Sequence, residues 1–352
     1  MKNNGDLRIL LVGDDTHEMY VKAFYNGMKQ MGYVSTKLFA INKCISPKTR
    51  IGKLLYRVET RLAVGPHICK VNGLLRTCIR EFNPNLVFVY STRIIDRKTI
   101  DFIKNMKCVL FAYNNDDPFT NSYHSYFWRK YINLLKCADV GFVYRKKNVE
   151  ECIKIGCQNV EILRAYYLEE RNFPKQVSVS NVPAVVFLGH YENDERQEYI
   201  CELLNEGIAV GIPEITWEAF NPNNELLIKL KDSHNNYNDL MNSCKIALVF
   251  LSKINSDEYT RRCFEIPATK KLMIAPYTEE LASMFVENKE VVFYRNKKEF
   301  VEKVQYYLLH EEERESIAEA GYNRLMTDGH EVKDRIKQVM ECYDEIVAKS
   351  HS

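Results

Sequence analysis

The sequence predicts an α/β protein made of two doubly wound domains, each a parallel sheet covered by helices on both faces. Short apolar runs alternate with amphipathic helical patterns over most of the 352 residues, which is typical of successive βα units. The alternation breaks at a polar segment with two prolines, residues 172–183, which we interpret as a linker, and restarts after it. The chain is also too long for one core, since domains usually have about 100–200 residues.

The predicted elements follow one another along both halves of the chain. The first strand ends at Gly13, and the helical pattern after it stops at Gly32. The predicted strands are residues 7–12, 86–90, 108–113, 141–144, 160–163, 184–189, 208–211, 246–251, 272–275 and 291–294. The predicted helices of the second half are residues 195–206, 261–269, 297–309, 311–326 and 332–349. The predicted domains are residues 1–175 and 184–330, with residues 331–352 as a closing helix.

Charge and cysteine content narrow the class of protein. A formal net charge of +2 gives little attraction to phosphate backbones, so nucleic acid is not expected as a partner. We interpret the basic run Arg145-Lys146-Lys147 as the solvated start of a helix. The eleven cysteines form no Cys-x-x-Cys pair, so we expect reduced thiols and no metal site.

The sequence also bears on location. The first residues lead straight into a strand without an apolar signal region, and no apolar run approaches the ~18 residues that span a bilayer. We therefore expect a cytoplasmic protein. Peripheral association with the inner face of the membrane stays open as an alternative.

Two familiar α/β functions are excluded by the loops after the strands. A nicotinamide-binding domain needs Gly-x-Gly-x-x-Gly after a strand, and residues 13–17 and 189–192 lack those glycines. The Asp14-Asp15 pair is typical of a phosphoacceptor receiver domain. That domain needs a further aspartate about forty residues on, and residues 50–60 contain none.

The most informative motif lies in the last third of the chain. Asp257 and Glu265 have seven residues between them, and Arg261 and Arg262 lie in that interval. Carboxylates accept hydrogen bonds from sugar and ribose hydroxyls, and arginines neutralise a diphosphate with their forked donors. The motif therefore favours a sugar nucleotide as ligand.

Residues 259–330 resemble the C-terminal domain of GT-B glycosyltransferases, the glycosyl transferases group 1 type, in the branch of the spore-maturation CgeB-like proteins. The segments that carry the resemblance are residues 260–268, 277–281, 291–294 and 310–321. Phe187-Leu188-Gly189 with Arg196 is similar to the start of that branch's second domain. The resemblance is good over residues 185–345 and weak over the first half.

The resemblance implies an architecture. Two Rossmann-like domains face each other across a cleft, with the acceptor bound by the first and the donor by the second. The closing helix crosses back to the first domain.

The resemblance also implies roles for single residues. Glu265 accepts the ribose hydroxyls, and Asp257 lies near the donor sugar. Arg262, with Arg261 as second choice, meets the diphosphate at a helix start, where unpaired N–H groups favour an anion. Gly189 lets the backbone approach the donor, and Arg196 adds a positive group.

The sequence departs from the family pattern at two places. Asp257 stands where retaining members have glutamate, which shortens the side chain by one methylene. Thr269-Lys270-Lys271 replaces a small Cys/Gly-Gly turn. Either lysine assists the phosphates, or both are simply solvated.

Candidate groups for the acceptor side follow two predicted strands. Asp116 and Asp117 come after the strand 108–113; each is a candidate base or acceptor ligand, with a turn that caps the next helix as the alternative. His17 follows the first strand and is a second candidate base, or else polar surface. We expect the aromatic side chains of residues 123–128 to pack in the core.

These observations predict a glycosyltransferase that moves a sugar from a nucleoside-diphosphate sugar, with UDP the commonest choice, to a glycan, lipid-linked or protein acceptor. No Asp-x-Asp of the metal-dependent kind is present, so we expect neither a bound metal nor a cofactor beyond the donor. Two alternatives remain: a GT-B-shaped sugar-nucleotide binding or regulatory protein without turnover, and a sugar-nucleotide epimerase.

Overall fold

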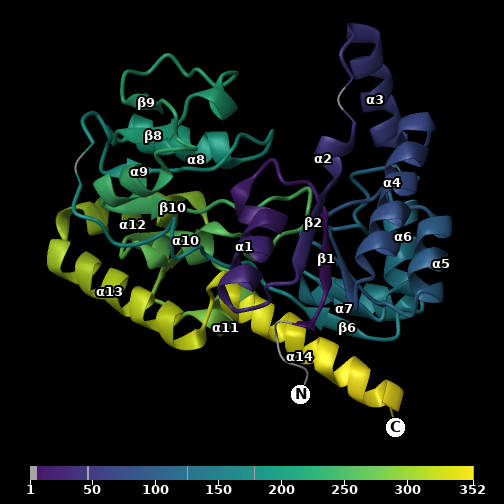
Figure 1. The fold of residues 1–352 in the computed structure, drawn as a ribbon. Helices are drawn as coiled ribbons and strands as arrows, with labels where there is room; N and C mark the ends of the chain where they lie inside the picture. Colours follow the sequence, from purple (N-terminus) through teal and green to yellow (C-terminus); the bar gives the residue numbers. More distant parts are fainter. Residues whose placement is uncertain (1–5, 46, 125, 178, 352) are drawn as a thin grey trace. The chain divides into compact units, whose positions relative to one another are not determined.

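The computed structural model describes residues 6–45, 47–124, 126–177 and 179–351. The chain divides into two compact units. Unit one comprises the chain up to Arg164 together with the segment from Val332 onward, and unit two comprises Ala165–Glu331. Over the described residues each unit contains a six-stranded parallel sheet with helices around it (Figure 1). The predicted fold class is therefore confirmed.

The sheet of unit one has the strand order β2-β1-β3-β4-β5-β6. The strands are, in that order, Thr36–Ala40, Ile9–Gly13, Leu86–Tyr90, Val109–Asn114, Val140–Val143 and Val160–Ile162. Ile9 of β1 pairs with Thr36 on one side and Leu86 on the other. The order therefore reverses next to β1, and loops after the strands open at the carboxyl edge there, where α/β sheets bind ligands.

The helices of unit one cover both faces of this sheet. They are α1 Ala23–Gln30, α2 Ile41–Cys44, α3 Arg50–Leu62, α4 Pro66–Phe82, α5 Arg97–Asn105, α6 Arg129–Cys137, α7 Lys146–Lys154 and α14 Val332–His351, with a π-helical turn η2 at Glu18–Lys22. Because helices lie on both faces, the central strand β3 is apolar and buried at every residue.

Unit two repeats the design with the strand order β12-β11-β10-β7-β8-β9. The strands are Val292–Tyr294, Leu272–Pro276, Ile246–Leu248, Val185–Val186, Val210–Pro213 and Leu227–Leu230. The helices are α8 Arg196–Asn205, α9 Tyr237–Ser243, α10 Arg262–Ala268, α11 Glu279–Met284, α12 Lys297–Leu309 and α13 Glu311–Asp328, with a 3-10 turn η3 at Ile215–Trp217. The side chain of Asn296 caps α12 by accepting from the Glu299 N–H at 3.0 Å, which fixes where that helix begins.

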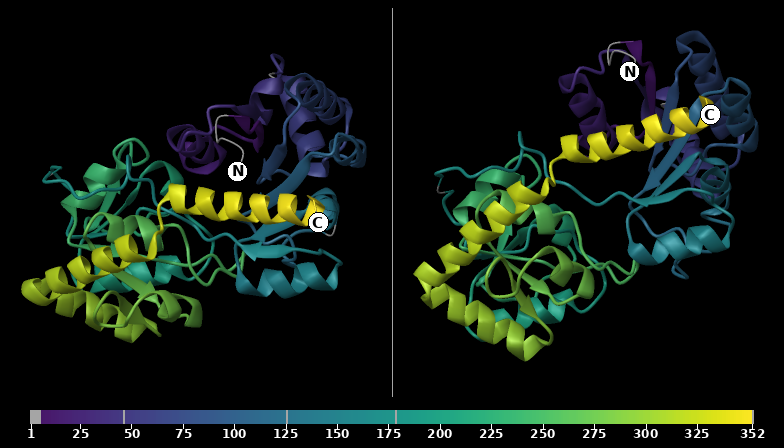
Figure 2. Two further views of the ribbon diagram at one scale, coloured as in Figure 1. Left: turned by 60° about the horizontal axis from the view of Figure 1, so that its bottom comes forward. Right: turned by 90° about the horizontal axis from the view of Figure 1, so that it is seen from below.

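The last helix, α14, belongs to unit one although it follows unit two in the sequence. It packs along α1 and ends at the C label in Figure 2. The approach is close at Gly27 of α1, where an added Cβ would lie 2.5 Å from Cδ1 of Ile336. Glycine at this position therefore permits the contact between the two helices.

The predicted linker at residues 172–183 lies inside unit two. Its backbone is tied to α9: Asn238 Oδ1 accepts from the Phe173 N–H, and Asn242 Oδ1 accepts from the Lys175 N–H at 2.8 Å. The interpretation as a free linker is wrong, because side chains of a distant helix satisfy these backbone groups. Unit two begins at Ala165 instead.

Within the described part of the chain, no helix is both long and apolar enough to cross a bilayer. All eleven cysteines are free thiols.

Candidate functional site

A pocket lies at the carboxyl edge of the sheet of unit two. Its volume is about 360 Å³. The strands β10, β11 and β12 point their carboxyl ends at it, and residues from α8 complete the wall. It is lined by Asp194, Glu195, Arg196, Tyr199, Phe250, Leu251, Ser252, Lys253, Ser256, Asp257, Pro276 and Tyr294. Two predicted donor residues, Arg196 and Asp257, thus share one pocket.

Arg196 begins α8 and is 3% exposed. Its guanidinium group contacts the carboxylates of Asp194 at 2.7 Å and Glu192 at 3.1 Å, and it donates to the His190 carbonyl at 2.8 Å. Although burial alone acts to raise it, contacts with His190 and Arg196 lower the pKa of Glu192. Arg196 therefore holds the loop before α8 together, and its role toward a donor stays a prediction.

Replacing Arg196 by methionine is expected to destabilise the protein by about 3–5 kcal/mol, because two poorly exposed carboxylates lose their cation. Chemical denaturation measures the change. The matched control is Lys297→Met, which breaks an exposed pair with Glu198 and should cost at most about 1 kcal/mol. An Arg196 variant as stable as this control would contradict the structural role.

The helix α10 carries Glu265, which is 6% exposed. Its Oε2 accepts a hydrogen bond from the hydroxyl of Tyr237, at the start of α9, at 2.9 Å. The Arg171 guanidinium group lies 5.4 Å from the centre of the Tyr237 ring. Burial and the Glu265 carboxylate raise the pKa of Tyr237 well above its ordinary range, so it stays a donor. Glu265 is thus a buried carboxylate fixed through one oxygen.

Arg262 and Gly189 lie against each other. The Arg262 guanidinium group is 5.2 Å from the centre of the Phe187 ring. A Cβ added at Gly189 would lie 3.0 Å from Arg262 Cζ and 2.3 Å from Phe187 Cζ, so glycine makes room for both side chains. Arg262 Nε is buried and has no hydrogen-bond partner in the described part of the chain. The neighbouring Arg261 places its guanidinium group 4.6 Å from the centre of the Tyr166 ring.

Asp257 lies in the loop that follows β10. Its backbone N–H donates to the Ser252 carbonyl at 2.9 Å, and its side chain is half-buried at the pocket. Between this loop and α8, Lys253 pairs with Glu195 at 2.9 Å. The fold therefore brings Gly189, Arg196 and Arg262 together around the Phe187 ring. Asp257 lines the pocket.

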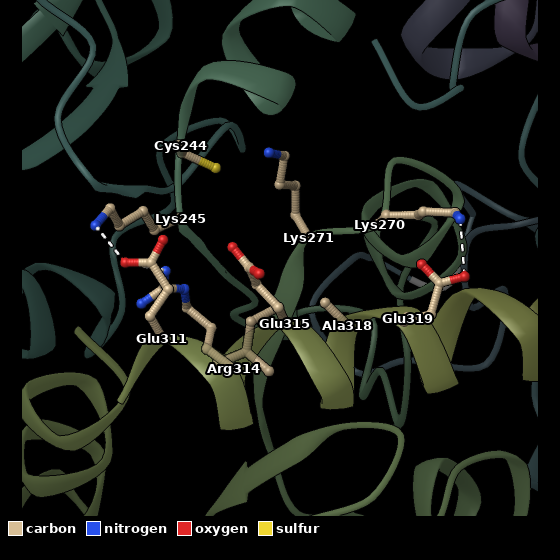
Figure 3. A pocket seen from close by; sticks show the side chains of 10 residues that line it. Cys244, Lys245, Lys270, Lys271, Glu311, Arg314, Glu315, Ala318 and Glu319 are labelled. Carbon is tan, nitrogen blue, oxygen red and sulfur yellow. Dashed lines mark hydrogen bonds and ion pairs between the residues drawn. The ribbon is translucent and has the colours of Figure 1, made fainter. Parts of the chain in front are cut away.

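Lys270 and Lys271 lie at the amino end of β11, away from this pocket. Figure 3 shows them lining a different cavity with Cys244, Lys245 and the first turns of α13. Lys270 pairs with Glu319 at 2.8 Å. The strand β11 has five residues, and each adds about 3.3 Å to its length, so the lysines at its amino end lie far from its carboxyl end. The interpretation that these lysines assist phosphates at the carboxyl edge is therefore wrong.

In unit one, Asp117 is fully buried after β4. Its carboxylate pairs with Lys147 at 2.6 Å and accepts from the Asn148 amide at 2.9 Å and the Phe119 N–H at 3.0 Å. These contacts bind the loop to the first turn of α7. Asp117 thus has a clear structural use, and a catalytic use stays a prediction.

Asp116, the adjacent residue, is half-buried. Burial raises its pKa, while the charges of Arg145 and Arg93 oppose that shift and Asp117 adds to it. Arg145 is 1% exposed and donates to the Asn115 carbonyl at 3.0 Å, so its interpretation as a solvated residue is wrong. A carboxylate whose pKa is raised, beside two cations, suits proton transfer.

His17 lies in the loop between β1 and η2 and is exposed. Its ring meets Tyr20 edge-on, with centroids 5.9 Å apart. In the sheet β3 separates β1 from β4, so His17 and Asp116 follow different strands that end at the same edge. A role for His17 as a base stays a prediction.

The aromatic segment after Asp117 differs from the expectation of core packing. Trp128 is buried, but Tyr123 and Tyr126 are about two-fifths exposed. They line a pocket of about 330 Å³ with Arg61, Asn121, Ser122, His124 and Phe127. Tyr123 stacks on Phe127, with centroids 4.5 Å apart, and Phe127 packs against the core of unit one.

Asp116→Asn is expected to raise the melting temperature near neutral pH. The folded-state pKa of Asp116 lies above the ordinary value of 3.8, so its contribution to stability is present at low pH and is lost as pH rises through the folded pKa. Asparagine stays neutral and keeps that contribution. Thermal unfolding at pH ~7 and ~3 measures the difference. The control is Asp101→Asn, at an exposed pair with Arg97 on α5. A gain that is equal at both pH values would contradict the assignment.

Comparison with known proteins identifies part of the chain. Residues 196–341 match the family model described as Glycosyl transferase-like. The matched residues up to Glu331 lie in unit two, and those from Val332 onward lie in α14 of unit one. No curated protein matches the sequence at a significant level.

Solved structures match the whole chain. HepE from Anabaena, in complex with UDP and glucose, is 10% identical, with 96% of this chain and 100% of that chain covered and a TM-score of 0.66. Sucrose-phosphate synthase from Thermosynechococcus elongatus is 8% identical, with 97% and 100% covered and a TM-score of 0.72. A putative UDP-N-acetylglucosamine 2-epimerase from Listeria monocytogenes is 10% identical, with 97% of each chain covered and a TM-score of 0.60. At such identities the similarity establishes the fold, and the predicted GT-B fold is confirmed.

Unit two contains functional candidates that sequence reasoning missed. Tyr237 donates to Glu265 and Arg171 lies against the Tyr237 ring, although neither lies near Glu265 in the sequence. In unit one the charge of Arg93 acts on Asp116. No local motif marks these residues.

Proposed function

We propose that the protein transfers a sugar from a nucleoside-diphosphate sugar, with UDP as the nucleotide, to a glycan, lipid-linked or protein acceptor, without a bound metal. The observation that carries the proposal is Glu265, buried in α10 with one oxygen held by Tyr237. Its other oxygen is left to accept ribose hydroxyls. Arg262 lies three residues earlier, with a buried Nε that has no protein acceptor in the described chain.

The proposed chemistry assigns one task to each group. The acceptor hydroxyl attacks the anomeric carbon, the bond from that carbon to the diphosphate oxygen breaks, and Asp116 takes the hydroxyl proton. Arg262 and Arg261 stabilise the charge that the leaving UDP gains, since fixed cations in a dry site are effective at this task. UDP in the HepE complex supports the choice of nucleotide.

An epimerase is a second candidate, because the Listeria protein has the same fold. The two functions differ in their products. Transfer or hydrolysis releases UDP, whereas epimerisation at carbon 2 yields a second sugar nucleotide. Binding without either product would indicate the regulatory alternative.

The test begins with thermal shift against the diphosphates of uridine, guanosine, thymidine and cytidine and their sugar forms, with and without EDTA. We expect the largest shift with a uridine compound, and no effect of EDTA. Chromatography of the UDP-sugar incubated with the protein then separates UDP from an epimer. No shift with any nucleotide would refute the proposal, and loss of the shift in EDTA would refute metal independence.

We also propose that the protein works peripherally at the cytoplasmic face of a membrane. Acceptors that carry a lipid are found there. The surface that could support such contact is on unit one.

A further inference from the structure

The helix α3 exposes the apolar side chains that a surface helix usually buries. Ile51, Leu54, Leu55, Val58 and Leu62 are between 42% and 73% exposed. At about 100° per residue, positions 51, 55, 58 and 62 form one stripe along the helix. None of the 13 residues of α3 is buried. An apolar stripe of this kind on a protein surface usually marks a contact site.

The opposite side of α3 is the one that packs on the protein. Tyr56 and Glu59 are half-buried there and face the start of α4. The Glu59 carboxylate accepts from the His67 backbone N–H at 2.8 Å and contacts the His67 ring at 3.0 Å. The single acidic residue of α3 therefore faces the protein and is hydrogen-bonded to His67.

Four cations line one side of the apolar stripe. Arg50, Lys53, Arg57 and Arg61 are all exposed, and at about 100° per residue they form a second stripe next to the first. We call the two stripes together the α3 face. It presents large apolar groups and positive charge, with no exposed carboxylate on the helix itself.

We propose that the α3 face lies on an anionic lipid bilayer, with the apolar stripe in the headgroup–acyl boundary and the cations among lipid phosphates. The helix is about 20 Å long at 1.5 Å per residue, so it lies in the plane of the interface and does not span. Charge complementarity selects this occupant. A second copy of the chain would oppose four cations with four cations, and a nucleic acid would leave the apolar stripe unpaired.

Vesicle flotation tests the electrostatic part. The full-length protein is expected to float with vesicles of phosphatidylcholine mixed with phosphatidylglycerol, and to stay behind with phosphatidylcholine alone. Lys53→Glu with Arg57→Glu should weaken binding to the mixed vesicles about tenfold or more, and added salt should weaken wild-type binding. The matched control, Lys154→Glu with Lys298→Glu, reverses equally many exposed charges on α7 and α12 and should bind like wild type.

A tryptophan at position 55 tests the apolar part. Trp128 and Trp217 are buried, so the added fluorescence of Leu55→Trp reports on the α3 face. Its emission should shift to the blue with mixed vesicles and stay unchanged with phosphatidylcholine. Any of three results would overturn the proposal. They are an equal loss of binding in the control variant, the absence of the blue shift, and a concentration-dependent dimer that the Lys53 and Arg57 reversals leave intact. UDP binding is measured in parallel and should be unchanged, because α3 takes no part in the donor site.

Discussion

Glu265→Gln is expected to weaken UDP binding by about 10- to 100-fold. The carboxylate is buried and accepts from Tyr237 at 2.9 Å, so its free oxygen is aimed without further ordering. A hydrogen bond to a charged acceptor contributes about 1.5–3 kcal/mol, and glutamine keeps the shape while it removes the charge. Isothermal titration with UDP gives the affinity directly.

Two variants separate the ribose contact from simple damage to α10. Tyr237→Phe leaves the carboxylate in place but removes its donor, so affinity should fall less than in Glu265→Gln. Glu319→Gln, whose partner is Lys270 at the amino edge of the sheet, should bind UDP as wild type does. Unchanged affinity in Glu265→Gln, with a normal unfolding curve, would remove the ribose role.

The fold was predictable from the sequence wherever a strand is covered on both faces. The predicted helix 297–309 coincides with α12, and the central strands were predicted from their apolar runs. The strands β2 and β9 were missed. Both lie at the ends of their sheets, where the exposed Lys37 and the half-buried Lys229 interrupt the apolar pattern.

The site was less predictable, because its contacts join distant segments. The bond from Tyr237 to Glu265 spans 28 residues, and no spacing rule relates them. Arg145 was misread for a related reason: three successive cations are typical of a solvated helix start, yet a loop from β4 covers the first of them. Sequence motifs indicated the chemistry of Glu265 and Arg262, and packing decides which partners hold them.

Asp116→Asn is expected to lower turnover by about 10²- to 10⁴-fold, the usual contribution of a general base, and to leave UDP affinity unchanged. The reason is that Asp116 lies in unit one beside Arg93 and Arg145, whereas Glu265 and Arg262, the residues that we propose bind the nucleotide, lie in unit two. Release of UDP from the sugar nucleotide chosen by thermal shift measures turnover.

The pH profile and a neighbouring variant make this prediction specific. Since burial raises the pKa of Asp116, wild-type turnover should fall on the acid side at a pH above the ordinary carboxyl range, and Asp116→Asn should lose that limb. Asp117→Asn should instead destabilise the fold, because Lys147 loses a fully buried partner at 2.6 Å. If Asp116→Asn keeps wild-type turnover, or if its acid limb is unchanged, Asp116 is not the base. Another group would then be the base, such as His17, whose loop follows β1 at the same edge of the sheet.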